Sequence, residues 1–251
     1  MTAESRRAFA ETMRAPEPDL GLACLLIGCE VFPDLDVAPE LARLDDLAAA
    51  VDGGDAAALR EALHDFRGYG DDYGDLRSSL LHEVLRRRRG LPITLSVVWL
   101  EVARRRGIPA AGIGLPGHFV VDVAGQLADP FYGGRLVSRA ELAARIGDLR
   151  DEHFEPWDVP SIVTRVLGNV RAASATRERL RTRLWAVELS MLVPAHSVAL
   201  RRERGEILIQ LGDYLAAAFE LEEYAAAVGP VDPEAADHAL RAARMSRARL
   251  S

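Results

Sequence analysis

Apolar residues change their spacing within residues 90–134, the segment around which the rest of the chain is organised. In the first part of this segment they recur at helical intervals and give one broad apolar surface, formed by Ile93, Val97, Leu100, Val102 and Ala103. Pro92 suits the first helical position, where its missing N–H costs nothing, and Gly107 and Pro109 end the pattern. The spacing therefore predicts a buried helix over residues 91–106.

The second part of the segment alternates between polar and apolar residues with a period of two, as strands do. The alternation covers residues 117–123, and a second short run follows at 127–131. A two-residue turn at Ala124-Gly125 or at Gly125-Gln126 can join the two runs. The pattern therefore predicts a β-hairpin directly after the buried helix.

The length of this turn decides which residues lie opposite each other. The first turn places Asp129 opposite Val120, and the second places it opposite Asp122. Both registers put Asp129 on the same sheet face as His118, because side chains alternate along a strand. A histidine that a neighbouring carboxylate orients is the base half of a nucleophilic triad. We therefore expect His118 and Asp129 to lie within hydrogen-bond reach.

Helical patterns fill most of the remaining chain up to residue 173. They cover residues 5–14, 20–32, 39–51, 55–66, 75–89, 139–146 and 161–173. Ser138 and Glu141 have the spacing of a capping box at the start of one of these helices. The run 86–89 is all arginine and closes another, where we expect ion pairs at a solvated helix end. Together with the hairpin, these helices predict an α+β fold with a small antiparallel sheet.

The end of the chain shows helical spacing alone. Helices are expected at 177–192, 201–211, 214–228 and 233–250. Gly205, Gly212, Ala217 and Leu221 keep the spacing of a tetratricopeptide unit, although Arg201 stands at the first position, which is usually Trp. About two such repeats cannot bury a core of their own. We therefore expect an all-α, tetratricopeptide-like region at 161–251, packed on a first domain at 1–160.

The charge and the cysteines narrow the class of protein. The net charge is −7, and residues 1–75 hold 17 acidic and 6 basic side chains, which does not suggest nucleic-acid binding. We find no apolar run of about 18 residues and no signal-peptide pattern near Met1, so we expect a soluble, cytoplasmic protein without membrane contact. Cys24 and Cys29 lie five apart in an apolar helix, which favours buried thiols over a disulfide.

Three motifs carry a resemblance to a known family: RRRRGLPITLSVVWLEVARRRGIP at 86–109, PGHFVV at 116–121 and DPFYGG at 129–134. They resemble the SirB family, bacterial proteins that have a transglutaminase-like domain of the papain type and a tetratricopeptide tail. The resemblance covers nearly the whole chain and implies a helix-rich transglutaminase-like core. His118 and Asp129 fall on the family's His and Asp. The family's Cys would fall at about Pro92, and no cysteine lies near it.

The residue types around position 92 do not provide another nucleophile. Pro92 has no reactive side chain, and Thr94 and Ser96 lie inside the predicted helix, where their hydroxyls can bond the carbonyl four residues back. A thiolate at a helix start is what an acyl transferase of this kind needs. For His118 the alternative is a structural histidine that a backbone carbonyl satisfies.

Metal and cofactor sites are not expected. His118, Asp122 and Asp129 can share a sheet face, but they lack the spacing of a metal site. Gly112-Ile113-Gly114 lacks the strand–helix context of a phosphate-binding loop.

Two functional hypotheses follow. The first is a non-catalytic interaction or regulatory protein, in which His118 and Asp129 are a triad remnant and the helical tail binds a protein partner. The second is an acyl-transfer or hydrolase-type enzyme, in which this pair acts with a nucleophile that is not cysteine or that a substrate or partner supplies. The oligomeric state and the identity of the partner are left open by the sequence.

Overall fold

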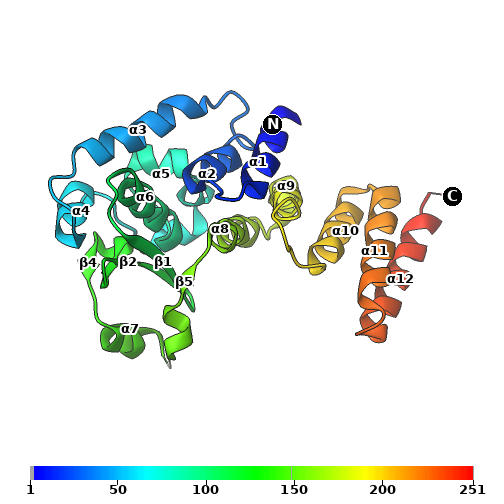
Figure 1. Ribbon diagram of the computed structural model, residues 1–251. Helices are drawn as coiled ribbons and strands as arrows, with labels where there is room; N and C mark the ends of the chain where they lie inside the picture. Colours follow the sequence, from blue (N-terminus) through cyan, green and yellow to red (C-terminus); the bar gives the residue numbers. More distant parts are fainter. Residues whose placement is uncertain (1–2, 148, 251) are drawn as a thin grey trace. The chain divides into compact units, whose positions relative to one another are not determined.

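The computed structural model describes residues 3–147 and 149–250 and divides the chain into two units, Met1–Asn169 and Val170–Ser251 (Figure 1). The first unit has the predicted α+β fold. Its helices are α1 (Ala3–Arg14), α2 (Leu20–Gly28), α3 (Val37–Ala49), α4 (Ala56–Leu63), α5 (Leu81–Arg87), α6 (Pro92–Arg105), α7 (Arg139–Ile146) and α8 (Val159–Ala173), which continues into the second unit. Its strands are β1 (Ala110–Leu115), β2 (His118–Val123), β3 (Gln126–Asp129), β4 (Arg135–Leu136) and β5 (Pro156–Trp157). The domain boundary predicted between residues 160 and 161 stays a prediction.

α6 is the central helix of the first unit. Pro92 lies in its first turn, and Leu91 precedes it in an extended conformation. Most of its side chains are buried, Trp99 and Ala103 completely. The helix contacts β1, β2 and the 3-10 turn η3 (Pro130–Tyr132). The predicted buried helix against the strands is therefore confirmed, and each large side chain that it buries contributes about 1.5–3 kcal/mol to stability.

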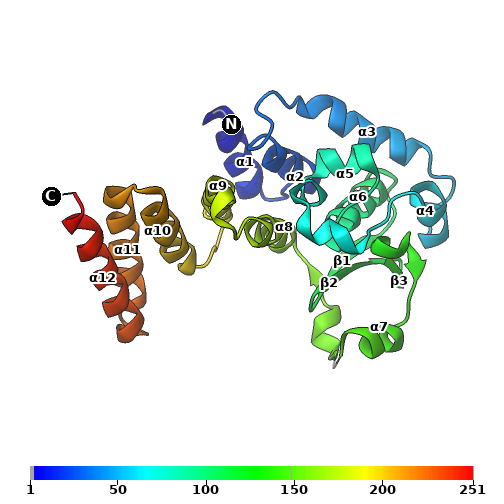
Figure 2. The same ribbon diagram turned by 180° about the vertical axis from the view of Figure 1, so that it is seen from behind.

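The sheet has five antiparallel strands in the order β4-β3-β2-β1-β5, and α6 and α7 lie on opposite sides of it (Figures 1 and 2). The sequence predicted only two strands. β1 escaped prediction because glycines interrupt its apolar pattern. At Gly114 the glycine is required, since an added Cβ would lie 2.2 Å from Cε2 of the Trp157 ring on the neighbouring strand. β4 and β5 have two residues each, which is too short for a periodic signal.

The hairpin between β2 and β3 follows the first of the two predicted registers. Val123 pairs with Gln126, so the turn consists of Ala124 and Gly125, which have φ angles of 50° and 87°. Positive φ at both central residues is typical of the type I′ turn that joins tightly paired strands. The register places Asp129 opposite Val120, on the face shared with His118.

The helix predicted over residues 75–89 is interrupted. A 3-10 turn, η2 (Leu76–Ser79), is followed by the extended residue Leu80 before α5 begins. Hydrogen bonds to distant residues hold the interruption: the Ser78 hydroxyl donates to buried Asp72 at 2.8 Å, and the Ser78 carbonyl accepts from the Thr94 hydroxyl at 2.7 Å. The two contacts span six and sixteen residues, so helical spacing of three and four residues could not predict them.

Two local predictions are confirmed. Ser138 caps α7, since its hydroxyl accepts from the Glu141 amide at 3.1 Å and the Glu141 carboxylate accepts from the Ser138 amide at 2.8 Å. Each arginine of the run 86–89 makes an ion pair, with carboxylates of the preceding helices and loops: Glu40 for Arg86, Asp75 for Arg87, Asp65 for Arg88 and Asp71 and Asp72 for Arg89.

The second unit contains α9 (Leu180–Ser190), α10 (Ala199–Leu211), α11 (Tyr214–Val228) and α12 (Pro233–Ala248). Gly212 ends α10 in the left-handed conformation, with φ of 84°. Gly205 lies at the crossing of α10 and α11, where an added Cβ would be 2.8 Å from Cγ of Leu221. The predicted helical hairpin is therefore confirmed, with the small residue at the point of close approach.

Candidate functional site

His118 and Asp129 form the expected pair. His118 is the first residue of β2 and Asp129 the last of β3, so the hairpin register brings them together. The His118 Nε2 lies 2.8 Å from the Asp129 Oδ2, with Asp129 completely buried and His118 9% exposed. A carboxylate at this distance fixes both the tautomer and the orientation of the imidazole. The predicted contact is confirmed, whereas a catalytic role of the two residues stays a prediction.

Asp129 has a further charged partner that the sequence did not indicate. Arg145, in the last turn of α7, donates from Nη2 to the same Oδ2 at 2.7 Å. The other carboxylate oxygen accepts from the Phe131 amide at 3.2 Å. The negative charge of Asp129 is therefore shared between His118 and a permanent cation. Only the three-dimensional packing of α7 on the sheet brings Arg145 to this point, so no spacing in the sequence could predict it.

Aromatic rings surround the pair. The centroids of Phe131 and Tyr132 lie 6.1 and 6.4 Å from that of His118, and the Arg145 guanidinium stacks 5.0 Å above the Tyr132 ring. Tyr73, from the loop before α5, lies 6.1 Å from Phe131. Partial burial raises the Tyr73 pKa, and negative charge on Tyr132 and Asp129 raises it further, so Tyr73 is a neutral hydroxyl at physiological pH.

A second arginine holds the backbone of His118. Arg165, on α8, donates from Nη2 to the carbonyl oxygens of Leu115 at 3.0 Å and His118 at 3.2 Å. Its guanidinium also lies 5.6 Å from the Trp157 ring centroid. Desolvation lowers the Arg165 pKa, and the nearby Tyr73 acts in the opposite direction. Arg165 thus fixes the strand end from which the imidazole projects.

The start of α6 offers no nucleophile in the described structure. Pro92 is buried in the first turn, and the Ser96 hydroxyl donates to its carbonyl at 2.8 Å, as predicted for a hydroxyl inside a helix. Thr94 donates to the Leu91 carbonyl three residues back and to the Ser78 carbonyl. Both hydroxyls are buried, so neither is poised to attack a substrate.

The two cysteines belong to the core, as predicted. Cys24 and Cys29 are buried free thiols in and directly after α2. Burial is the main cause that raises the pKa of each thiol, with nearby carboxylates adding to it, so neither is a reactive thiolate at neutral pH.

Over residues 3–147 and 149–250, no three His, Cys, Asp or Glu side chains cluster as metal ligands would. No helix in the same ranges is long and apolar enough to cross a membrane.

Comparison with known proteins gives matches over both units. Residues 37–168 match the family model of the transglutaminase-like superfamily, and residues 170–248 match that of the tetratricopeptide repeat. A UPF0162 protein of Xylella fastidiosa is 37% identical over 186 residues, which cover 67% of this chain and 66% of the relative. A UPF0162 protein of Pseudomonas aeruginosa is 31% identical over 67% of this chain and 69% of its own length. Mouse F-box only protein 21 is 37% identical over 67 residues, or 11% of that protein.

Proposed function

The chain belongs to the transglutaminase-like superfamily, as a homologue of UPF0162 proteins with a tetratricopeptide region, and from this premise we propose that it is a non-catalytic interaction or regulatory protein. We assign it, more finely, to the SirB family, with the helical tail serving as the docking surface for a protein partner in the cytoplasm of a bacterium. Tetratricopeptide arrays offer extended surfaces of this kind.

The observation that carries the proposal is the side chain at the start of α6. An acyl transferase of this architecture needs a thiolate at the helix N-terminus, close to the imidazole that activates it. Position 92 is a buried proline, and the neighbouring hydroxyls of Thr94 and Ser96 are committed to backbone carbonyls. His118 and Asp129 therefore keep the base half of a triad without its nucleophile.

The contacts of Asp129 support a structural use of the pair. This one carboxylate links the start of β2, the turn η3 and the end of α7 through His118, the Phe131 amide and Arg145. Removing a buried carboxylate that holds three donors leaves those donors unsatisfied, at a cost of about 1–3 kcal/mol for each buried group. The His118–Asp129 pair therefore stabilises the fold even without a catalytic role.

The second hypothesis, an acyl-transfer or hydrolase-type enzyme, is favoured by one specific observation. His118 is oriented through Nε2, at 2.8 Å from Asp129, while no described residue forms a hydrogen bond with its Nδ1. The second ring nitrogen can therefore exchange a proton with a group that a substrate or a partner provides.

A Pro92→Cys variant separates the two hypotheses. The variant is treated with an activated acyl ester, and acylation of each cysteine is located by mass spectrometry. We expect the wild-type protein to remain unlabelled, since its thiols are buried in the core. Acylation at residue 92 that is lost in the Pro92→Cys/His118→Ala double variant would indicate an inactive enzyme that keeps the geometry of the triad and lacks only the nucleophile.

The remaining outcomes decide the role of the pair. If the folded Pro92→Cys variant is not acylated, the imidazole and residue 92 do not meet, and the pair is purely structural. If instead the wild-type protein hydrolyses the ester, and His118→Ala abolishes this by about 10²–10⁴-fold with the fold intact, the non-catalytic proposal is wrong.

The docking role is tested by affinity capture from the native cell. The full chain and a chain that ends before residue 176 are compared under the same conditions. We expect a protein partner that the full chain retains and the shortened chain loses. Retention by both would assign the partner to the first domain and would remove the tail from the proposal.

A further inference from the structure

A pocket of about 430 Å³ lies between the turn η3 on one side and α4 with the loop that follows it on the other. It is lined by Arg60, His64, Arg67, Gly68, Phe131, Tyr132, Gly133 and Arg135. The wall between α4 and η3 is fixed by a backbone hydrogen bond of 2.9 Å from the Gly68 amide to the Phe131 carbonyl. A pocket of this size suits a small molecule.

The charges in this pocket are of one sign. Three arginines line it, and none of the described residues that line it is acidic. Within the described ranges, neither Arg60 nor Arg67 forms an ion pair, and Arg135 pairs with the half-exposed Glu141 at 2.6 Å. The nearby Asp65 does not line the pocket: it pairs with Arg88 at 2.7 Å and with the lining residue His64 at 3.0 Å, and Arg67 donates to the His64 carbonyl at 3.3 Å.

This concentration of positive charge runs against the composition of its surroundings. The chain has a net charge of −7, and its acidic residues outnumber the basic ones most strongly before residue 75. Arginines placed close together repel one another, and this costs stability unless a counter-charge is present. The arrangement therefore points to an anion that the chain itself does not supply.

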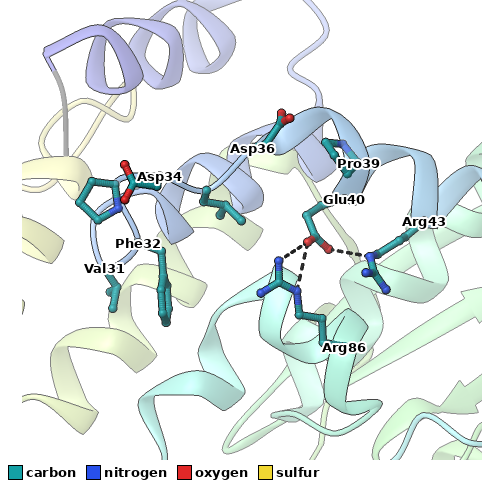
Figure 3. A pocket seen from close by; sticks show the side chains of 10 residues that line it. Val31, Phe32, Asp34, Asp36, Pro39, Glu40, Arg43 and Arg86 are labelled. Atoms are coloured by element: carbon teal, nitrogen blue, oxygen red, sulfur yellow. Dashed lines mark hydrogen bonds and ion pairs between the residues drawn. The ribbon is translucent and has the colours of Figure 1, made fainter.

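A second pocket shows what a self-neutralised arrangement looks like (Figure 3). It lies between the loop after α2 and the helices α3 and α5, and it also contains two arginines. There the buried carboxylate of Glu40 points at both of them and pairs with Arg43 and Arg86. The basic pocket beside η3 contains no such carboxylate.

We propose that the pocket formed by Arg60, Arg67 and Arg135 beside Tyr132 is a binding site for a small organic phosphate monoester. Guanidinium groups form strong, directional hydrogen bonds to phosphate oxygens, and a dianion matches a site with two arginines that form no described ion pair and a third whose partner Glu141 is half-exposed. Tyr132 is 54% exposed and offers its ring to the organic part of the ligand. The same ring lies 6.4 Å from the His118 ring, so a bound monoester would sit next to the His118–Asp129 pair.

The test is a calorimetric titration of the full chain with phenyl phosphate, inorganic phosphate and benzoate. We expect phenyl phosphate to bind more tightly than inorganic phosphate, because the ring adds contacts with Tyr132. Benzoate should bind more weakly than phenyl phosphate, because a carboxylate has fewer oxygens and less charge. Affinity for phenyl phosphate should fall as the NaCl concentration rises.

The variants are chosen for their exposure. Arg60→Gln/Arg67→Gln replaces two exposed residues, so the fold should survive, and we expect binding of phenyl phosphate to weaken by about ten-fold or more. The double Lys variant at the same positions should retain part of the affinity. Arg106→Gln is the matched control, because Arg106 is an exposed arginine at the end of α6 without a described ion pair.

Three results would overturn the proposal. The first is no binding of phenyl phosphate to the wild-type chain at millimolar concentration. The second is equal affinity in the wild-type chain and in Arg60→Gln/Arg67→Gln, or an equal loss in Arg106→Gln, which would indicate non-specific attraction. The third is a site that prefers inorganic phosphate or benzoate, which would contradict a monoester as ligand.

Discussion

The two units differ in the size of the side chains that they bury. The interior of the first unit is built from large apolar side chains, and its largest fully buried residues include Trp99, Phe9, Phe66 and Phe119. The core between α11 and α12 consists mostly of alanines: Ala218, Leu221, Tyr224, Ala225, Ala236, Ala239 and Ala243. Burial of apolar area is the main stabilising term in folding, so this helix pair gains less from it for each residue than a core of large side chains does.

The second unit compensates with charge. Glu220 on α11 is nearly buried and accepts from Arg201 at 3.1 Å and from Arg204 at 2.6 Å, both on α10. Arg204 also donates to Glu188 on α9 at 2.9 Å, so one network joins three helices. Close helix packing through small residues and an ion network thus supplement a smaller cluster of large side chains, Val187, Leu200 and Ile207, on α9 and α10. The two units should therefore respond differently to substitutions, salt and pH.

The largest effect is expected in the apolar core. Ala103→Asp places an unpaired charge at a completely buried position of α6, which should cost several kcal/mol, roughly the stability of a whole domain, and unfold the first unit. Thermal unfolding followed by circular dichroism measures the change. Ala42→Asp on the exposed side of α3 is the control and should stay close to the wild type. A native melting temperature for Ala103→Asp would contradict the assignment of α6 as the core helix.

The next effect concerns the close helix crossing in the second unit. Gly205→Ala adds a Cβ at 2.8 Å from Leu221 and 3.3 Å from the Ala217 carbonyl, so α10 and α11 must separate. We expect a loss of about 1–3 kcal/mol in the free energy of unfolding, as for other overpacked cores. Urea denaturation measures it, with Glu206→Ala on the exposed side of the same helix as control. Equal stability of Gly205→Ala and the wild type would show that the crossing is looser than described.

The buried network supplies a matched pair of substitutions on one helix. Glu220→Gln leaves Arg201 without a described carboxylate partner and Arg204 with Glu188 alone, and should cost about 1–3 kcal/mol. Glu222→Gln removes an exposed pair with Arg247, and such pairs contribute no more than about 1 kcal/mol. Urea denaturation of the two variants at low and high NaCl should separate them. If both lose the same amount, burial does not distinguish the two carboxylates.

The smallest effect is a pH dependence in the first unit. Burial lowers the pKa of His82, with Arg86 acting in the same direction and Glu83 and Glu40 in the opposite one. In the unfolded chain the His82 imidazole binds a proton near pH 6.5, whereas in the folded state it binds this proton only at lower pH. Stability due to His82 is therefore complete above this pH and falls below it, by at most about 1.4 kcal/mol per pH unit. The free energy of unfolding is measured by denaturation at pH 7.5 and at pH 5.5. The difference between the two pH values should be smaller for His82→Gln than for the wild type. His238→Gln, at an exposed position, should show the wild-type difference.

The sequence predicted those parts of the fold that local chemistry determines. The helix of 91–106, the hairpin with its two permitted registers and the Ser138 cap are found as expected, because each depends on neighbours a few residues apart. The same holds for the contact between His118 and Asp129, which follows from strand alternation.

The missed features depend on contacts that extend beyond the periodic spacing of one helix or strand. Position 114 of strand β1 is a glycine because the Trp157 ring, from the neighbouring strand β5, occupies the space that a side chain would need. The break before α5 depends on hydrogen bonds of Ser78 with Asp72 and Thr94. Arg145 reaches Asp129 only through the packing of α7. None of these contacts leaves a periodic signal.

The two-residue turn at Ala124-Gly125 also limits how this segment can evolve. Inserting or deleting a single codon there would shift β3 by one position and turn Asp129 to the other side of the sheet, away from His118. Adding two codons would restore its side but would move it along the strand, out of register with the imidazole. Changes of length are thus confined to other loops of the first unit, while substitutions at the turn remain open to residues that accept a positive φ. In an alignment of homologues that retain the pair, the distance from His118 to Asp129 should be constant.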